Sequence, residues 1–246
     1  MTDTQTATVT PDKTDLLFII DRSGSMSSIY KETSESLIQI IQEQKLLPGD
    51  VKFSLVTFDH EVAYLNDRTS ITEMDGNKII EGIKPRGYTA LLDACGVAID
   101  GLGISLSKLA EADRPDKVIV MIFTDGEENS SATFTREQIK ERIKHQTEKY
   151  SWNFLFFGAN QDAILAGESL GVSRNSSMSY GANADGVRNT KGTITNRINT
   201  IRRVGNTEAK ELAYTAEERG GAMGTDGNVT GIVGTVGQRD ISRSSQ

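Results

Sequence analysis

Three oxygen-bearing residues, Asp21, Ser23 and Ser25, directly follow the apolar run LLFII, and Gly24 separates the two serines. A continuous apolar run of this length is typical of a strand that is covered on both faces of a sheet. The carboxylate and the two hydroxyls therefore stand at the carboxyl end of the predicted strand. Oxygen atoms are the ligands that hard cations such as Mg²⁺ prefer, so this spacing predicts a cation site.

Other polar residues follow the remaining apolar runs in the same way. Thr89 lies in a glycine-bearing loop before a helix, while Asp59, Asp125 and Asn160 follow the runs VKFSLVTF, VIVMIFT and FLFFGA. In a parallel α/β sheet, ligands bind beyond the carboxyl ends of the strands, so we expect these side chains to gather at one edge. A single aspartate after a strand is more often a helix cap or turn residue, and the prediction therefore depends on the joint pattern.

Composition limits the classes of function. The chain has 246 residues, of which 37% are hydrophobic and 25% charged, enough for a sizeable core. A net charge of −7 argues against general binding to nucleic acid or anionic membranes and suits a cation-binding protein. Cys95 is the single cysteine, which excludes an internal disulfide, and its flanks indicate a buried free thiol on a helix.

The sequence shows neither a secretory signal nor a membrane span. The first 15 residues lack a basic region followed by an apolar one, and no apolar run approaches the roughly 18–20 residues of a spanning helix. We therefore expect a cytoplasmic protein without a membrane partner, and association with a virion stays open.

Strand and helix patterns alternate from residue 15 to residue 180. This alternation predicts an α/β fold with a Rossmann-like, doubly wound, mostly parallel sheet and helices on both faces. The second and third strands lie close enough in sequence to pair as a hairpin. Strands are predicted at 15–21, 51–59, 60–67, 116–126, 152–160 and 176–180, and helices at 30–45, 77–82, from about 91 to 109, 136–150, 161–171 and 187–203.

The chain divides into four predicted parts. A flexible leader (1–14) precedes the α/β domain (15–180), which is followed by a basic amphipathic helix (181–204) that packs on the domain. The basic side of this helix also leaves open the docking of an acidic partner or nucleic acid. A glycine-rich C-terminal extension (205–246) contains eight glycines, which disfavour independent folding, and we expect a flexible tail. Its segment 229–236 carries β-branched residues that suit strand addition to a neighbouring chain.

The sequences DRSGS, GYTALLDA and FTDGEEN resemble the metal-ion-dependent adhesion site of von Willebrand factor type A (VWA) domains. The family pattern is Asp-x-Ser-x-Ser followed by a distant threonine and a distant aspartate, and all five positions match at Asp21, Ser23, Ser25, Thr89 and Asp125. The resemblance covers about residues 14–180. Within the family, ANQDA and FTDGEEN are similar to features of small intracellular bacterial and phage proteins of the tellurite-resistance and stress-associated type.

This resemblance implies one antiparallel edge strand and a bound Mg²⁺ or Mn²⁺. We interpret Ser23, Ser25 and Thr89 as direct ligands, and Asp21 and Asp125 as residues that act through water or from behind the hydroxyls. A first shell with so little negative charge favours a carboxylate from outside the domain. The resemblance accordingly implies a partner protein whose Glu or Asp completes the coordination, and a binding module without catalytic residues.

Two other classes of function stay open. A metal-dependent hydrolase would need a general base near the ion, and His60 is the one histidine placed for that role. A structural protein, such as a phage particle component, would assemble or self-associate through the C-terminal extension. Five residues are candidates for the rim of the site: Asp59, His60, Glu127, Glu128 and Asn160.

Overall fold

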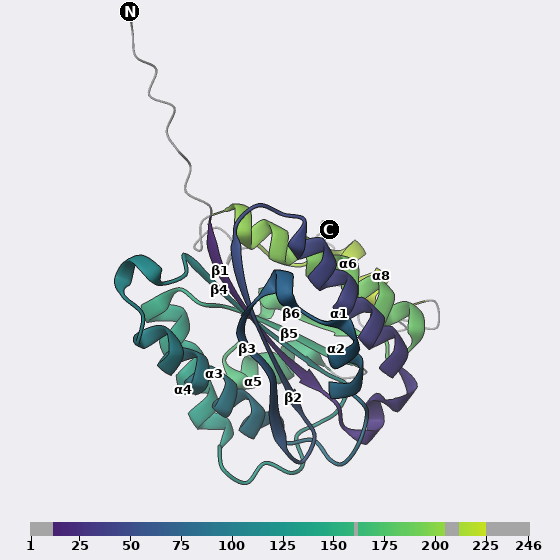
Figure 1. The fold of residues 1–246 in the computed structure, drawn as a ribbon. Coiled ribbons are helices and arrows are strands. Elements are labelled where there is room, and N and C mark those ends of the chain that lie inside the picture. The colour runs from purple at the N-terminus through teal and green to yellow at the C-terminus, as the bar shows by residue number, and fades with distance from the viewer. Residues whose placement is uncertain (1–11, 160–161, 205–211, 225–246) are drawn as a thin grey trace, which may run out of the picture.

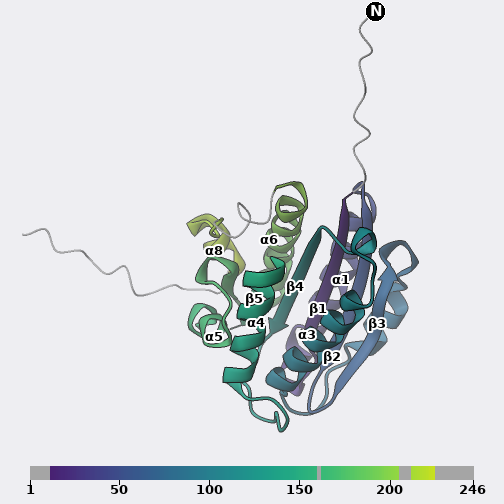
Figure 2. The same ribbon diagram turned by 90° about the vertical axis from the view of Figure 1, so that its left-hand side faces the viewer.

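The computed structural model describes residues 12–159, 162–204 and 212–224. Its sheet has six strands in the order β3-β2-β1-β4-β5-β6, and Figure 2 shows β5 to β3 side by side. Only β3 is antiparallel to its neighbour, so the predicted mostly parallel sheet with one antiparallel edge strand is confirmed. The strands are β1 (Lys13–Asp21), β2 (Asp50–Phe58), β3 (Val62–Ser70), β4 (Lys117–Thr124), β5 (Asn153–Ala159) and β6 (Ser177–Tyr180).

Helices cover both faces of the sheet (Figure 1). Successive side chains of β1 point to opposite faces, so Phe18 joins one core with α1, α2, α6 and α8, while Ile19 joins the other with α3, α4 and α5. This explains why the apolar run of β1 is continuous. The helices are α1 (Tyr30–Lys45), α2 (Gly76–Gly82), α3 (Leu91–Ser107), α4 (Arg136–Tyr150), α5 (Ala163–Leu170), α6 (Ala184–Arg203) and α8 (Ala216–Ala222).

The strand register brings the ends of the central strands to one level. Asp21 lies opposite Phe58 of β2, and Ile20 lies opposite Phe123 of β4. Because these three strands are parallel, the residues that follow them leave the sheet at the same edge. The predicted site residues on β1, β2 and β4 therefore start from neighbouring positions.

Strand β3 begins later than expected. The prediction began it at His60, but residues 59–61 form the turn of the hairpin, and the strand covers Val62–Ser70. The cause is local, because the Asp59 carboxylate accepts a hydrogen bond from the backbone N–H of Glu61 at 2.7 Å. A turn of this kind competes with continuation of the ladder.

Part of the predicted extension packs on the domain. Residues 212–224 contain α8, which begins with a capping box between Thr215 and Glu218 and contacts α6 and β6. Tyr214, just before it, is 6% exposed and joins the core beside Phe157. The structure thus differs here from the expected flexible tail, since one buried aromatic residue and a capped helix hold this segment. The proposed strand at 229–236 lies outside the described residues.

Within the described residues, no helix combines the length and the apolar character that a membrane span requires.

Candidate metal centre

The turn after β1 places two serine hydroxyls together. Asp21 is 1% exposed, and its carboxylate accepts hydrogen bonds from the Ser23 N–H at 2.7 Å and from the Thr124 hydroxyl at 2.5 Å. These bonds hold the carboxylate beneath the turn. The chain then enters a short 3₁₀ helix, Gly24–Ser28, and the hydroxyls of Ser23 and Ser25 lie 3.0 Å apart.

Asp125 and Thr89 complete this group of oxygen atoms. The Ser25 hydroxyl donates to Asp125 Oδ1 at 2.6 Å. A Cβ atom placed on Gly126 would lie 3.2 Å from Thr89 Oγ1 and 3.6 Å from Ser25 Oγ, so both hydroxyls stand on the same side of this glycine. The structure therefore brings together the five residues that the sequence singles out: Asp21, Ser23, Ser25, Thr89 and Asp125.

Asn129 positions Thr89, a role that the sequence analysis does not assign. The Thr89 N–H donates to Asn129 Oδ1 at 3.0 Å, and the Thr89 carbonyl accepts from the N–H groups of Asn129 and Ser130 at 3.1 and 3.2 Å. Thr89 itself is 3% exposed. The loop after β4 thus binds both the N–H and the carbonyl of Thr89. No sequence signal other than proximity to Asp125 indicates this pairing.

Glu127 and Glu128 occupy different surroundings. Glu127 is exposed at the surface, as a rim residue would be. Glu128 instead accepts hydrogen bonds from the N–H groups of Leu92, Ser130 and Ser131 and from the Ser131 hydroxyl, all at 2.7–2.9 Å. Its carboxylate therefore satisfies free donors at the start of α3 and fixes the loop after β4.

Asp93 anchors the same loop from the helix side. Its carboxylate accepts hydrogen bonds from the N–H groups of Ala132, Thr133 and Phe134 at 2.8–2.9 Å. Burial alone would raise the pKa of Asp93, but these backbone donors outweigh it and hold the pKa below the ordinary value of 3.8. The charged form of Asp93 is therefore the form that the fold stabilises.

The electrostatics of the centre favour a bound cation. Burial raises the pKa of Asp21 to about 6, hydrogen bonds from Thr124 and Ser23 offset part of this rise, and the charge of Asp125 adds to it. Burial also raises the pKa of Asp125. A cation among these groups would offset the cost of two neighbouring carboxylates. Hydroxyl and carboxylate oxygens without sulfur or imidazole are a donor set that fits Mg²⁺ or Mn²⁺.

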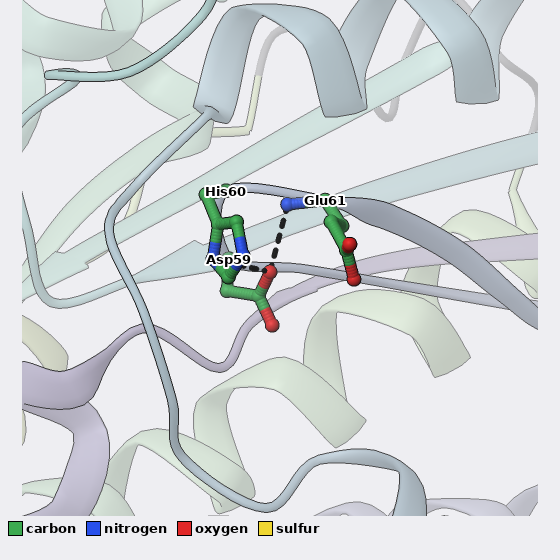
Figure 3. A group of neighbouring side chains, drawn as sticks. All are labelled: Asp59, His60 and Glu61. Carbon is green, nitrogen blue, oxygen red and sulfur yellow. Dashed lines mark hydrogen bonds and ion pairs between the residues drawn. The ribbon is translucent and has the colours of Figure 1, made fainter.

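A second acidic cluster lies beside this centre, at the turn after β2. Possible ligand atoms of Asp59, His60 and Glu61 lie within 4.8 Å of one another (Figure 3). Arginine side chains already balance the carboxylates, because Arg22 Nε and Arg86 Nε lie 2.9 and 2.6 Å from Asp59 Oδ2, and Arg86 also pairs with Glu61. We therefore interpret this cluster as an ion-pair network and not as a second cation site.

This network holds together the two loops that carry the hydroxyls. The Arg86 N–H donates to the Arg22 carbonyl at 2.8 Å, and the Gly24 N–H donates to the Gly87 carbonyl at 3.1 Å. Gly87 has φ 68°, and a Cβ atom there would lie 2.1 Å from His60 Nδ1. Only glycine fits this position, and His60 supports the loop.

The sequence analysis does not identify Arg22 or Arg86, although both are basic residues close to the motif. Asn160, the remaining rim candidate, lies outside the described residues.

Comparison with known proteins agrees with this geometry. Residues 16–128 match the model of the VWA_2 family, the von Willebrand factor type A domain. This range includes all five residues of the candidate centre. No curated protein matches the sequence.

Several solved structures share the fold. Proximal thread matrix protein 1 from the mussel byssus has a TM-score of 0.54 at 15% identity, over 75% of this chain and 45% of that one. Another structure of the mussel protein, described as having a zinc-occupied MIDAS motif, has a TM-score of 0.53 at 16% identity, over 75% of this chain and 45% of that one. The von Willebrand factor domain of the type V pili tip protein Mfa5 from Porphyromonas gingivalis has a TM-score of 0.54 at 13% identity, over 79% of this chain and 98% of that one.

The chain spans about half the length of the mussel protein. At these identities the likeness concerns the fold alone.

Proposed function

We propose that this chain is a divalent-cation-dependent protein-binding module of the von Willebrand factor type A kind, because residues 16–128 match the model of that domain. Ser23, Ser25 and Thr89 would hold the ion directly through their hydroxyls. Asp21 and Asp125 would orient these hydroxyls and coordinated water molecules from behind. The bound ion would supply a positive centre with an open coordination position, and a Glu or Asp of the partner would occupy that position.

One observation carries this proposal: neutral hydroxyls and two carboxylates from three separate loops converge beside Gly126. Ser25 Oγ lies 3.0 Å from Ser23 Oγ and 2.6 Å from Asp125 Oδ1. Hydroxyl ligands do not neutralise a divalent ion, so the ion would retain affinity for an external carboxylate. Asp21 is too deeply buried to meet a partner directly, which supports its role behind the hydroxyls.

We further propose Mg²⁺ or Mn²⁺ as the natural ion. The zinc-occupied site of the mussel protein indicates that a similar fold accepts another divalent ion. Zinc sites in proteins are, however, built mainly from cysteine and histidine, with some carboxylates, whereas this centre offers hydroxyl and carboxylate oxygens. The finer assignment to small bacterial or phage proteins of the tellurite-resistance type rests on the sequence resemblance alone.

A non-enzymatic role is also part of the proposal. The similar structures include a byssus matrix protein, a minor pilin and a pili tip protein, none of which is described as an enzyme. His60, the candidate general base, lies 3.2 Å from the Asp59 carboxylate and beside Gly87, where it supports a loop. These contacts favour a structural role for His60.

Thermal unfolding tests the metal centre directly. Mg²⁺ that binds the native state raises the melting temperature by mass action. We expect a rise that saturates with Mg²⁺ concentration in the wild type and is absent in Asp125→Ala. Glu127→Ala is the matched control, since it removes an exposed carboxylate two residues away and should keep the full rise. Equal rises in wild type and Asp125→Ala would contradict the assignment.

A pull-down from cell extract then tests the partner. Proteins captured with Mg²⁺ and released by EDTA should also be missing from the capture by Asp125→Ala. A partner that is retained in EDTA and by Asp125→Ala would show that the contact lies outside the metal centre.

A further inference from the structure

Tyr88, the residue before Thr89, exposes a large aromatic ring in the loop that carries this proposed ligand. Its side chain is 70% exposed, and its hydroxyl makes no hydrogen bond to the described residues. The next residue, Thr89, is 3% exposed and carries one of the proposed ligand hydroxyls. A buried ligand and an exposed ring therefore occupy adjacent positions of one loop.

The loop presents this ring on a rigid backbone. The N–H groups on either side of Tyr88, those of Arg86 and Ala90, donate to the carbonyls of Arg22 at 2.8 Å and Asp59 at 2.7 Å. The Gly87 carbonyl accepts from Gly24, as described above. An aromatic ring on a fixed backbone loses little conformational entropy when it is buried in an interface, since only its two side-chain torsions become ordered.

The rest of the rim is polar or small. Of the large hydrophobic side chains that are exposed in the described residues, only Tyr88 lies in the loops 22–28, 59–61, 84–89 and 125–131 that surround the centre. Exposed neighbours in these loops include Ser25, Ser27, Glu61 and Glu127. A solvent-exposed tyrosine has no role in the core, and aromatic anchors of this kind dominate the energetics of interfaces.

We propose that Tyr88 is the anchor that sets partner specificity at this site. It packs against an apolar side chain located one or two residues from the acid that ligates the ion. The residues that flank the acid are the natural contacts of the ring, because Tyr88 and the proposed ligand Thr89 are adjacent in the chain. The proposal rests on the proposed function, since the acid is recognised through the metal.

Charge makes the two contacts interdependent. Without the ion, the negative charges of Asp125 and of the buried Asp21 behind it would repel an incoming acid. The Tyr88 ring alone therefore binds the acid-bearing segment of the partner weakly, and the ion alone accepts any accessible carboxylate. Together they select an acid with an apolar neighbour.

An array of immobilised ten-residue peptides tests this inference. Each peptide has one central Asp, flanked at the first and second positions by Leu or Phe in one set and by Ser in the other. We expect wild-type protein in Mg²⁺ to bind the apolar set at least about tenfold more tightly than the serine set, and EDTA to abolish binding to both. Tenfold corresponds to about 1.4 kcal/mol, within the range of an interface anchor.

Variants separate the ring from the metal centre. Tyr88→Ala should remove the preference for the apolar set, and Tyr88→Phe should keep it. The Mg²⁺-induced rise in melting temperature should be unchanged in both variants, because the ring is not a ligand. Tyr150→Ala is the matched control: Tyr150 is 52% exposed but lies at the end of α4, at the opposite edge of the sheet.

The outcomes distinguish the two proposals. Binding that EDTA abolishes, but that is equal for both peptide sets and unchanged in Tyr88→Ala, would overturn the role of Tyr88 and leave the proposed function intact. Failure of every peptide to bind in an EDTA-sensitive manner would contradict recognition of an acid through the metal, and with it this inference.

Discussion

At the scale of single residues, Ser25 joins the two halves of the proposed metal centre. Its hydroxyl contacts Ser23 on the loop after β1 and donates to Asp125 on the loop after β4. The residue is exposed, so its side chain makes little contribution to the core. A loss of this hydroxyl should therefore affect the binding of the ion far more than the stability of the fold.

The pair Ser25→Ala and Ser27→Ala tests this expectation. Ser25→Ala should weaken Mg²⁺ binding about tenfold or more, because the loss of a group that only supports a metal ligand already costs about 10–100-fold in affinity. Ser27 is also exposed but donates to the Gly24 carbonyl at 2.7 Å, so Ser27→Ala should leave the affinity within about twofold. Isothermal titration with MgCl₂ or MnCl₂ measures both. Equal affinities in the two variants would contradict the role of Ser25.

At the scale of elements, the loop between β4 and α4 is held against α3 by hydrogen bonds in both directions. Asp93 accepts three of its backbone N–H groups, and Glu128 of the loop accepts the N–H of Leu92 in α3. The same loop carries Asp125 and Asn129, and Asn129 Oδ1 accepts a hydrogen bond from the Thr89 N–H. The metal centre thus depends on contacts between α3 and this loop, and not only on the strands.

Asp93→Asn should destabilise the protein in a pH-dependent way. The folded protein lowers the pKa of Asp93, so the stabilisation is present above the ordinary value of 3.8 and is lost as the pH falls through the lower folded value. Urea unfolding at pH 7 should show a loss of about 1.5–3 kcal/mol in Asp93→Asn, the usual size for hydrogen bonds to a charged group.

The difference between wild type and Asp93→Asn should narrow as the pH is lowered to 3 and below. Asp113→Asn, at an exposed aspartate in the loop before β4, is the control and should change stability little at either pH. A difference that is constant over this pH range would show that the charge of Asp93 does not matter.

At the scale of the whole molecule, the segment 212–224 closes the β6 side of the sheet. Tyr214 lies 5.9 Å from the ring of Phe157, and the guanidinium groups of Arg197 and Arg219 lie 4.9 and 5.6 Å from the Tyr214 ring. Arg219 also donates to the Ser177 carbonyl of β6 at 3.0 Å. The segment is therefore part of the packed structure, although it follows the family match at 16–128.

Tyr214→Ala should destabilise the domain by about 3 kcal/mol, the range for removing a large buried aromatic side chain. Leu212→Ala is the control, because Leu212 is 38% exposed and should change the free energy of unfolding by less than about 1 kcal/mol. Chemical denaturation measures both. A Tyr214→Ala variant as stable as wild type would show that this segment contributes nothing to the packed domain.

The sequence by itself determined the sheet and the five residues at its edge. Continuous apolar runs such as that of β1 are local signals, because burial on both faces of a sheet requires them. The positions after these runs follow from topology, since parallel strands end at one edge. The sequence therefore predicts that Asp21 and Asp125 lie near each other, and in the structure Asp21 accepts from the Ser23 N–H while Asp125 accepts from the Ser25 hydroxyl.

Only the tertiary structure decided which acids face the centre and which do not. Glu128 satisfies backbone donors of α3, and Asp59 is paired with Arg22 and Arg86, which lie 37 and 27 residues away in sequence. Neither pairing follows a periodicity or a fixed spacing along the sequence from which it could be predicted. A carboxylate in a loop has the same local sequence context whether it meets solvent, a cation or an arginine, and the partner is known only once the chain has folded.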